Sequence, residues 1–183
     1  LVFNTDTIET IGYAWCLNSH YDYDTERTEK YFPNLTGSLV LPSNLKIIGN
    51  YAFRGNPGFT SNLVIPDGVT TIGDYAFYGC NYLNGNLVIP DSVTTLGKYA
   101  FAYCYSFNGT LTLSSNLTVI EDDVFAGCTG LRGDLIVPDG VTSIGSRAFG
   151  GFNSGSRMFE NGTLTLPDSV ITIKSDAFDY CRF

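Results

Sequence analysis

The chain has little of what most enzymes and nucleic-acid-binding proteins need. Its 183 residues include one histidine, His20, and only ten Lys and Arg residues against eighteen Asp and Glu residues. The formal net charge of −8 argues against nucleic acid or anionic lipid as a partner, because phosphate recognition needs clustered basic side chains. No apolar run reaches the roughly 18 residues that span a bilayer. We therefore expect no nucleic-acid partner and no membrane insertion.

A repeat of 24 residues organises what is present. The chain is 44% hydrophobic, enough for a sizeable core, and similar units start at regularly spaced leucines. We expect a single repeat domain over 1–183, with a degenerate first coil and an insertion in 1–38 and about seven coils in all. The expected coils are 39–62, 63–86, 87–110, 111–134, 135–163 and 164–183, the last displaced by five extra residues in the preceding connection.

Each unit has a strand, a corner and a second extended side. In the unit that starts at Leu63, the alternation of Leu63 and Ile65 with an outward residue predicts a short parallel strand. A proline and an Asp-Gly turn follow, and then the β-branched stretch 69–72. The recurring Ala-Phe step predicts one helical turn that inserts a phenylalanine into the core. That series is Phe53, Phe77, Phe101, Phe125, Phe149 and Phe178.

The residues LVIPDGVTTIGDYAFYGC at 63–80 and LVIPDSVTTLGKYAFAYC at 87–104 resemble the BspA-like, or Treponema pallidum-type, leucine-rich repeats. The resemblance covers nearly the whole chain, although the period here is 24 residues rather than 23. It implies an α/β solenoid, mostly β, with short parallel strands and one short helical turn per coil. It also implies a cell-surface or secreted protein of the adhesion type, and it names no catalytic residue or cofactor.

A cysteine column and a set of turn aspartates are the candidates for chemistry. Cys80, Cys104, Cys128 and Cys181 share one repeat position, which favours buried free thiols over a metal-thiolate site or disulfides. Catalysis built around His20 is the weaker reading of that residue. Aligned turn carboxylates either are solvated or hold a hard cation such as calcium, and we favour solvation. These carboxylates are Asp67, Asp91, Asp139 and Asp168. We expect no enzyme, no cofactor and no metal.

Four sequons predict glycosylation sites if the source is a secretory eukaryote. They begin at Asn34, Asn108, Asn116 and Asn161. Asn and Thr are also common in solenoid turns, so an unmodified turn is the alternative reading of each.

Two columns of side chains are candidate interfaces. A tyrosine column, with further tyrosines nearby, either contacts a partner or only covers one side of the coil. An apolar outward stripe on the strand side also predicts an interface. The tyrosines are Tyr51, Tyr75 and Tyr99, and the stripe is Val40, Val64, Val88, Thr112, Ile136 and Thr165. The charged and aromatic segment 18–33 is either a binding loop or a local cap.

The expected function is therefore protein or glycan recognition at a cell surface or outside the cell. The rival is a structural subunit of an extracellular fibre or layer, assembled by head-to-tail stacking. That rival arises because the hydrophobic cross-section of the last unit has no polar cap in the sequence.

Overall fold

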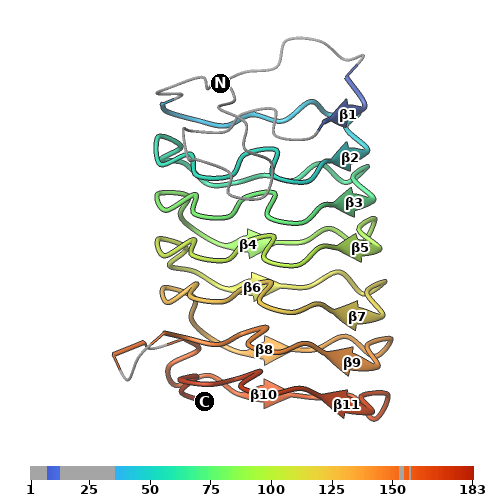
Figure 1. Ribbon diagram of the computed structural model, residues 1–183, viewed down its shortest axis with the longest axis vertical. Helices are drawn as coiled ribbons and strands as arrows, with labels where there is room; N and C mark the ends of the chain where they lie inside the picture. The colour runs from blue at the N-terminus through green and yellow to red at the C-terminus, as the bar shows by residue number, and fades with distance from the viewer. Residues whose placement is uncertain (1–7, 13–35, 153–154, 157) are drawn as a thin grey trace, which may run out of the picture.

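In the computed structural model, the structure describes residues 8–12, 36–152, 155–156 and 158–183. This part of the chain forms a stack of coils with eleven strands of two residues each (Figure 1). The strands are β1 (Thr10–Ile11), β2 (Ile47–Ile48), β3 (Thr71–Ile72), β4 (Leu87–Val88), β5 (Thr95–Leu96), β6 (Leu111–Thr112), β7 (Val119–Ile120), β8 (Leu135–Ile136), β9 (Ser143–Ile144), β10 (Leu164–Thr165) and β11 (Thr172–Ile173).

The strands form two columns, and every pairing is parallel. One column contains the sheets β1-β2-β3-β5 and β7-β9-β11, and the other contains β4-β6 and β8-β10 (Figure 1). Ile47 pairs with Thr71, and Thr71 pairs with Thr95, so each step along the stack is one sequence repeat. The predicted leucine-rich repeat solenoid with short parallel strands is thus confirmed.

The phenylalanines of the repeat stack in the centre of the coils. The rings of Phe53, Phe77 and Phe101 lie 5.1 Å apart at each step, with interplanar angles of 15° and 6°. A coil about 4.8 Å thick has no interior of its own, so each ring is buried only by the coils above and below it. The expected series is buried from Phe53 to Phe149, and Phe178 is partly buried in the last coil.

The described residues contain no helix, and the expected helical turn is a run of β-turns. Tyr75, which stands just before the Ala-Phe step, has a φ of 55°, and this left-handed backbone interrupts a helix. The N–H groups then alternate in direction: that of Ala76 turns back to the Gly73 carbonyl, whereas that of Phe77 reaches the Ala100 carbonyl of the next coil. The same position is left-handed in Tyr51, Tyr75, Tyr99, Asp123, Arg147 and Asp176.

The ladder of the first column is interrupted between β5 and β7. Elsewhere a glycine begins the corner, and a Cβ on Gly97 would lie 2.5 Å from the Asp74 nitrogen of the preceding coil. The coil of β7 carries Glu121 there, whose Cβ prevents so close an approach. The β5 coil also carries Lys98 where Asp74 offers an oxygen to the next coil's N–H, at 2.8 Å. The Phe101 and Phe125 rings are accordingly 5.9 Å apart, wider than their neighbours.

The two ends of the stack differ in what the structure describes. Of the degenerate first coil, β1 is described and pairs with β2, while Ala14, Trp15 and the segment 18–33 lie outside the described residues. In the last coil, Ile171 is 85% exposed, and Ile173 of β11 and Phe183 are also exposed. These apolar side chains have no further coil over them.

Candidate functional site: an aromatic face

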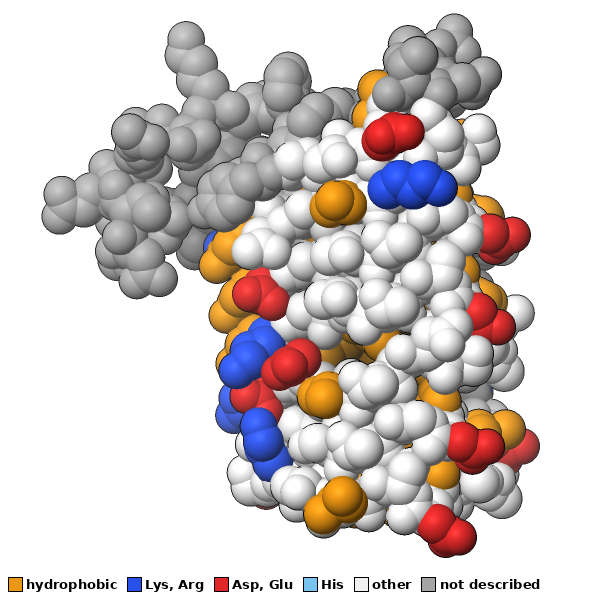
Figure 2. All heavy atoms as spheres, turned by 90° about the vertical axis from the view of Figure 1, so that its right-hand side faces the viewer, with side chains coloured by type: hydrophobic (Ala, Val, Ile, Leu, Met, Phe, Trp, Pro, Cys, Tyr) orange, Lys and Arg blue, Asp and Glu red, His pale blue; other side chains and the backbone are white. Residues whose placement is uncertain are grey.

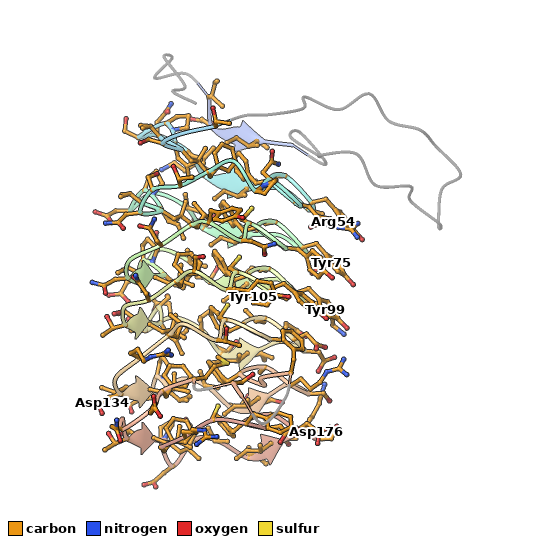
Figure 3. The ribbon with its side chains drawn as sticks, turned by 90° about the vertical axis from the view of Figure 1, so that its left-hand side faces the viewer. Arg54, Tyr75, Tyr99, Tyr105, Asp134 and Asp176 are labelled. Carbon is orange, nitrogen blue, oxygen red and sulfur yellow. The ribbon has the colours of Figure 1, made fainter. Side chains whose placement is uncertain are left out.

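Tyrosines of three successive coils form a stacked column on the turn side. The ring centroids of Tyr51 and Tyr75 are 4.9 Å apart, and those of Tyr75 and Tyr99 are 4.7 Å apart, with interplanar angles of 4° and 9°. All three side chains are half-buried and point outward from one edge of the stack; Figure 3 shows this for Tyr75 and Tyr99. Partial burial and the neighbouring Tyr99 raise the pKa of Tyr75.

A second aromatic column lies beside the first. Tyr75 is 5.5 Å from Tyr78, and Tyr78 is 4.9 Å from Tyr103. Tyr103 in turn stacks on Phe152 at 4.5 Å, and the edge of Tyr105 meets both of these rings. The two columns together are called the aromatic face, made of Tyr51, Tyr75, Tyr78, Tyr99, Tyr103, Tyr105 and Phe152. Its most exposed members are Phe152 and Tyr105, at 41% and 42%.

Phe152 reaches this face because its coil carries the insertion. It stands at the repeat position that cysteine occupies in other coils, yet its ring lies outside the core. On the far side of the insertion, Ser156, Met158 and Phe159 are buried instead. The Ser156 hydroxyl accepts the backbone N–H of Phe152 at 3.2 Å. The five extra residues therefore release one ring from the core onto the surface.

Gly127 leaves the space that Phe152 fills. A Cβ on Gly127 would lie 1.7 Å from the Cε2 atom of Phe152. Tyr103 belongs to the coil before that of Gly127, and Phe152 belongs to the coil after it. The ring of Phe152 thus crosses a coil that has no side chain at this place, and it extends the column of Tyr78 and Tyr103 by one step.

Charged side chains border the aromatic face. The guanidinium of Arg54 lies 5.4, 5.5 and 5.3 Å from the ring centroids of Tyr51, Tyr75 and Tyr78. Below Tyr99, the tyrosine column is continued by Asp123, whose carboxylate accepts two hydrogen bonds from Arg147 at 2.7 and 3.2 Å. The hydrogen bond to Asp123 raises the pKa of Arg147 further, so the pair is fully charged at any physiological pH.

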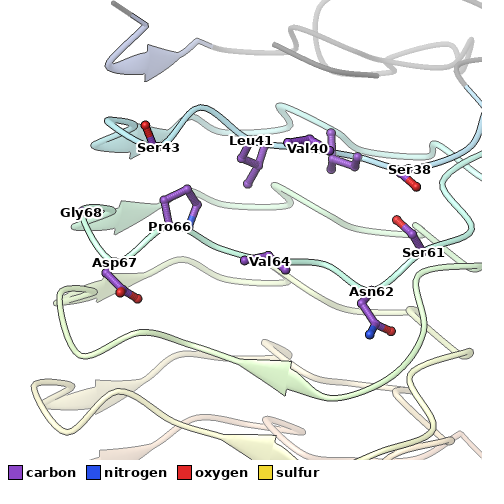
Figure 4. A pocket seen from close by; sticks show the side chains of 11 residues that line it. Ser38, Val40, Leu41, Ser43, Ser61, Asn62, Val64, Pro66, Asp67 and Gly68 are labelled. Atoms are coloured by element: carbon purple, nitrogen blue, oxygen red, sulfur yellow. The ribbon is translucent and has the colours of Figure 1, made fainter. Parts of the chain in front are cut away.

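The expected apolar stripe faces outward on the strand side. Val64 is 70% exposed and Ile136 is 62% exposed, and the other four members are exposed as well. Between the coils of Val40 and Val64, which are joined by a single parallel bridge, lies a groove of about 790 Å³. Leu41 and Pro66 line its apolar floor, and serines and Asn62 lie at its side (Figure 4). This groove is a second candidate contact surface.

The opposite strand face is different in character. Figure 2 shows mostly uncharged polar side chains there, with isolated apolar ones and charged groups toward the borders. Threonines of the pattern donate hydrogen bonds to the coil before, as Thr70 does to the Lys46 carbonyl at 3.3 Å. On one border, Asp122 pairs with Lys98 at 3.1 Å and with Lys174 at 3.0 Å. These side chains hold neighbouring coils together and offer no continuous apolar area.

The cysteine column is a hydrogen-bond ladder. The thiol of Cys104 donates to the Phe77 carbonyl of the preceding coil at 3.1 Å, and Cys80, Cys128 and Cys181 donate in the same way. Asn56, at the same position, donates through its amide to Phe53 at 3.0 Å. All four described cysteines are free thiols, and burial raises the pKa of Cys128 to about 12. Such thiols are poor nucleophiles and poor metal ligands.

The remaining candidates do not assemble into a centre. The four turn aspartates are exposed, and Asp91 accepts the Ser115 N–H at 2.7 Å, which lowers the pKa of its carboxyl. Among the described residues, no three His, Cys, Asp or Glu side chains are grouped so as to hold a metal ion. His20 lies outside the described residues, so its proposed role in catalysis has no structural test.

Three of the four sequons lie in the described part of the chain, and their asparagines are exposed. The side chain of Asn116 already donates to the Asp91 carbonyl at 2.7 Å, and that of Asn108 accepts the Gly85 N–H at 3.1 Å. Asn161 has a left-handed backbone, with a φ of 62°. Asn34 lies outside the described residues. A glycan on Asn116 would compete with the bond that its amide nitrogen makes.

The comparisons with known proteins agree with this architecture. The family model of the BspA type leucine rich repeat region matches residues 29–155 in six copies. The chain belongs to the BspA-type leucine-rich repeat family. A search of the curated proteins gives no match. Among solved structures, the BspA-type chain is similar to a leucine-rich repeat protein from Bacteroides ovatus, with 19% identity and a TM-score of 0.29 over 93% of this chain and 72% of the other.

Two residues of the aromatic face were not anticipated from the BspA-type repeat. Phe152 was noted only as an exception at the cysteine position, and Arg54 was not singled out. A signal for Phe152 exists in retrospect: a large apolar residue replaces cysteine immediately before an insertion, one coil after a glycine. No signal in the sequence separates Arg54 from a solvated arginine.

Proposed function

We propose that this chain is a non-catalytic binding module that recognises a protein partner through its aromatic face, at a cell surface or outside the cell. The observation that carries the proposal is the position of Phe152, an exposed apolar ring stacked on Tyr103 where the repeat places a core residue. Burying such a ring against a partner recovers about 1.5–3 kcal/mol that its exposure costs.

The composition of this face supports a protein interface. Tyrosine, phenylalanine and arginine are enriched at the centres of protein interfaces, and they supply most of the residues whose truncation weakens binding. The rings here are held in place by their neighbours, as Tyr103 is by Tyr78 and Phe152. A partner therefore pays little conformational entropy to meet them.

The stacking geometry favours a protein over a glycan. Sugars bind aromatic residues by lying flat on a ring face. In the column of Tyr51, Tyr75 and Tyr99, the faces are turned toward one another, with interplanar angles below 10°. The face offers ring edges and hydroxyl groups, which suit peptide groups and apolar side chains.

Location outside the cell or at its surface is supported by the family, whose members are typically surface-associated. In the part of the chain that the structure describes, no helix has the length and apolarity to cross a membrane.

Panning a displayed library of random dodecapeptides on the immobilised chain tests the proposal. Selected peptides are then measured against Tyr105→Ser/Phe152→Ser and against Val64→Ser/Val88→Ser, a matched pair of exposed apolar residues on the strand side. We expect loss of binding with the first variant and retention with the second. Peptides that depend on the strand stripe, or a library without specific binders, would contradict the aromatic face as the recognition surface.

A second candidate function is assembly by end-to-end stacking. The exposed Ile171 and Ile173 of the last coil support it, because the edge of β11 can accept another coil of the same pattern. Sedimentation velocity over a hundredfold range of concentration tests this candidate, with Ile171→Thr/Ile173→Thr as the variant. Stacking predicts a sedimentation coefficient that rises with concentration and no longer does so in the variant. A constant coefficient for both proteins excludes it.

A further inference from the structure

Arg54 differs from the other paired cations of the described stack. Lys98 and Lys174 share Asp122, and Arg147 forms two hydrogen bonds with Asp123. Within the described residues, the guanidinium of Arg54 has no carboxylate within ion-pair distance. It lies instead above three tyrosine rings, at centroid distances of 5.3 to 5.5 Å.

This placement prepares the guanidinium for a planar anion. Aromatic rings attract the charge through the face of the guanidinium and restrict the side chain, but they accept none of its in-plane hydrogen bonds. Those donors remain available, and their fork matches the two oxygens of a carboxylate. The arginine is half-buried beside Tyr51 and Tyr75, so a carboxylate that binds there is partly removed from water. Partial desolvation strengthens the pairing.

The local charge allows this in spite of the acidic chain. The nearest acidic group of the tyrosine column, Asp123, is neutralised by Arg147. The carboxylate of Asp74, also near Tyr75, accepts the Lys98 backbone N–H on the other side of the corner at 2.8 Å. Arg54 therefore stands as an uncompensated positive charge at the upper end of the aromatic face (Figure 3).

We propose that Arg54 is the anchor for a carboxylate of the protein partner, from an aspartate, a glutamate or a chain terminus. The inference rests on the proposed function and specifies its partner: an acidic group at Arg54, and an apolar contact at Phe152. The two positions belong to the first and fifth of the fully described coils, on the order of 20 Å apart at about 4.8 Å per coil. Only a macromolecular partner spans that distance.

The test uses peptides selected on the wild-type chain, each synthesised with its acidic residues and with Gln or Asn in their place. Binding is measured to wild type, Arg54→Gln and Lys46→Gln; the last removes one positive charge from the same coil, on its strand side. We expect the acidic form to bind wild type and Lys46→Gln at least about tenfold more tightly than the amide form. On Arg54→Gln the two forms should bind alike. A circular dichroism spectrum equal to wild type shows that the variant is folded.

Each other outcome overturns the inference in a distinguishable way. Selected peptides that lack acidic residues, or a preference for the acidic form that persists on Arg54→Gln, remove the role of Arg54 but leave the proposed function. Absence of any peptide that depends on Tyr105 and Phe152 removes both. A hyaluronan oligosaccharide, added as a separate probe, overturns the choice of a protein partner if it binds wild type but not Arg54→Gln while no acidic peptide does so.

Discussion

The ring of Phe152 lies on the ring of Tyr103, with centroids 4.5 Å apart and planes inclined by 14°, although two coils separate the residues along the stack. The contact exists because the coil between them carries Gly127, whose missing Cβ leaves room for the Phe152 ring. The aromatic face therefore depends on three residues that are far apart in the repeat: one without a side chain, one left-handed tyrosine, and one phenylalanine released by an insertion.

Gly127→Ala should be more destabilising than the same change at a matched glycine. Both Gly127 and Gly79 are left-handed, with φ of 72° and 70°, but a Cβ on Gly79 meets nothing closer than 3.8 Å. We expect Gly79→Ala to lower the free energy of unfolding by about 1–2 kcal/mol and Gly127→Ala by about 2–4 kcal/mol, since the latter also displaces Phe152. Urea unfolding measures both.

The Phe152→Ala background separates strain from the ring clash. There, Gly127→Ala should cost no more than Gly79→Ala does, because the obstructing ring is gone. If Gly127→Ala costs the same with and without Phe152, the two residues are not in contact.

The interrupted ladder between β5 and β7 should appear in amide hydrogen exchange. The Gly97 N–H donates to the Ile72 carbonyl at 2.8 Å and the Gly145 N–H to the Ile120 carbonyl at 2.7 Å. Within the described stack, the equivalent N–H of Glu121 has no such acceptor. We expect the Glu121 amide to exchange at least several-fold faster than the other two, because local opening is easier where the ladder is broken.

The variant Lys98→Asn/Glu121→Gly restores the repeat at both sites and should reduce that difference. Equal protection of all three amides in the wild-type chain would show that the ladder is continuous.

The cysteine ladder should make the fold sensitive to alkali. Burial raises the pKa of the Cys104 thiol well above its usual value and that of Cys128 to about 12, while unfolded thiols titrate near about 8.5. The folded state thus retains protons that the unfolded state loses. This contribution to stability is complete below about pH 8.5 and declines as the pH rises toward 12.

Alkylation provides the direct measurement. At pH 8, iodoacetamide should modify Cys80, Cys104 and Cys128 far more slowly in the native chain than in urea, as followed by peptide mass spectrometry. Native and denatured rates that agree for Cys104 would mean that this side chain is not buried.

Acid should weaken the contacts of Asp122. Hydrogen bonds from Lys174 and from the Ser146 backbone lower the pKa of Asp122 to about 2, against about 3.9 in an unfolded chain. The folded state therefore favours the carboxylate, and its contribution is complete above about pH 4 and is lost as the pH falls toward 2. Both lysines are half exposed, so we expect at most about 1 kcal/mol.

Asp122→Asn keeps an oxygen for the Ser146 N–H but loses the pairs with the lysines. Its free energy of unfolding should fall less steeply than that of wild type between pH 4 and 2, while Asp139→Asn, an exposed turn residue, should behave as wild type. A variant with the wild-type slope would show that the pairs with Lys98 and Lys174 contribute nothing in solution.

Much of the fold could be predicted because stacked positions must share a chemistry. Phe77 and Phe101 recur since each ring is the floor of the next, and a strict period therefore reports the stack directly. The outward direction of Val64 follows from strand alternation in the same way.

The remaining features depend on neighbours that are 24 or more residues away. Nothing local marks Tyr75 as left-handed, so the Ala-Phe step suggested a helical turn that is absent from the described residues. Lys98 and Glu121 look like ordinary substitutions until they are stacked on Asp74 and Gly97. The length of an insertion likewise does not indicate that Phe152 is the residue that leaves the core.

The position of the Phe152 ring is measured most directly by nuclear Overhauser effects in a chain with selectively labelled phenylalanine and tyrosine. We predict contacts between the ring protons of Phe152 and Tyr103, together with contacts from Phe152 to the α protons of Gly127. Contacts from Phe152 to the core rings of Phe125 and Phe149, with none to Tyr103, would contradict the aromatic face and the recognition role proposed for it.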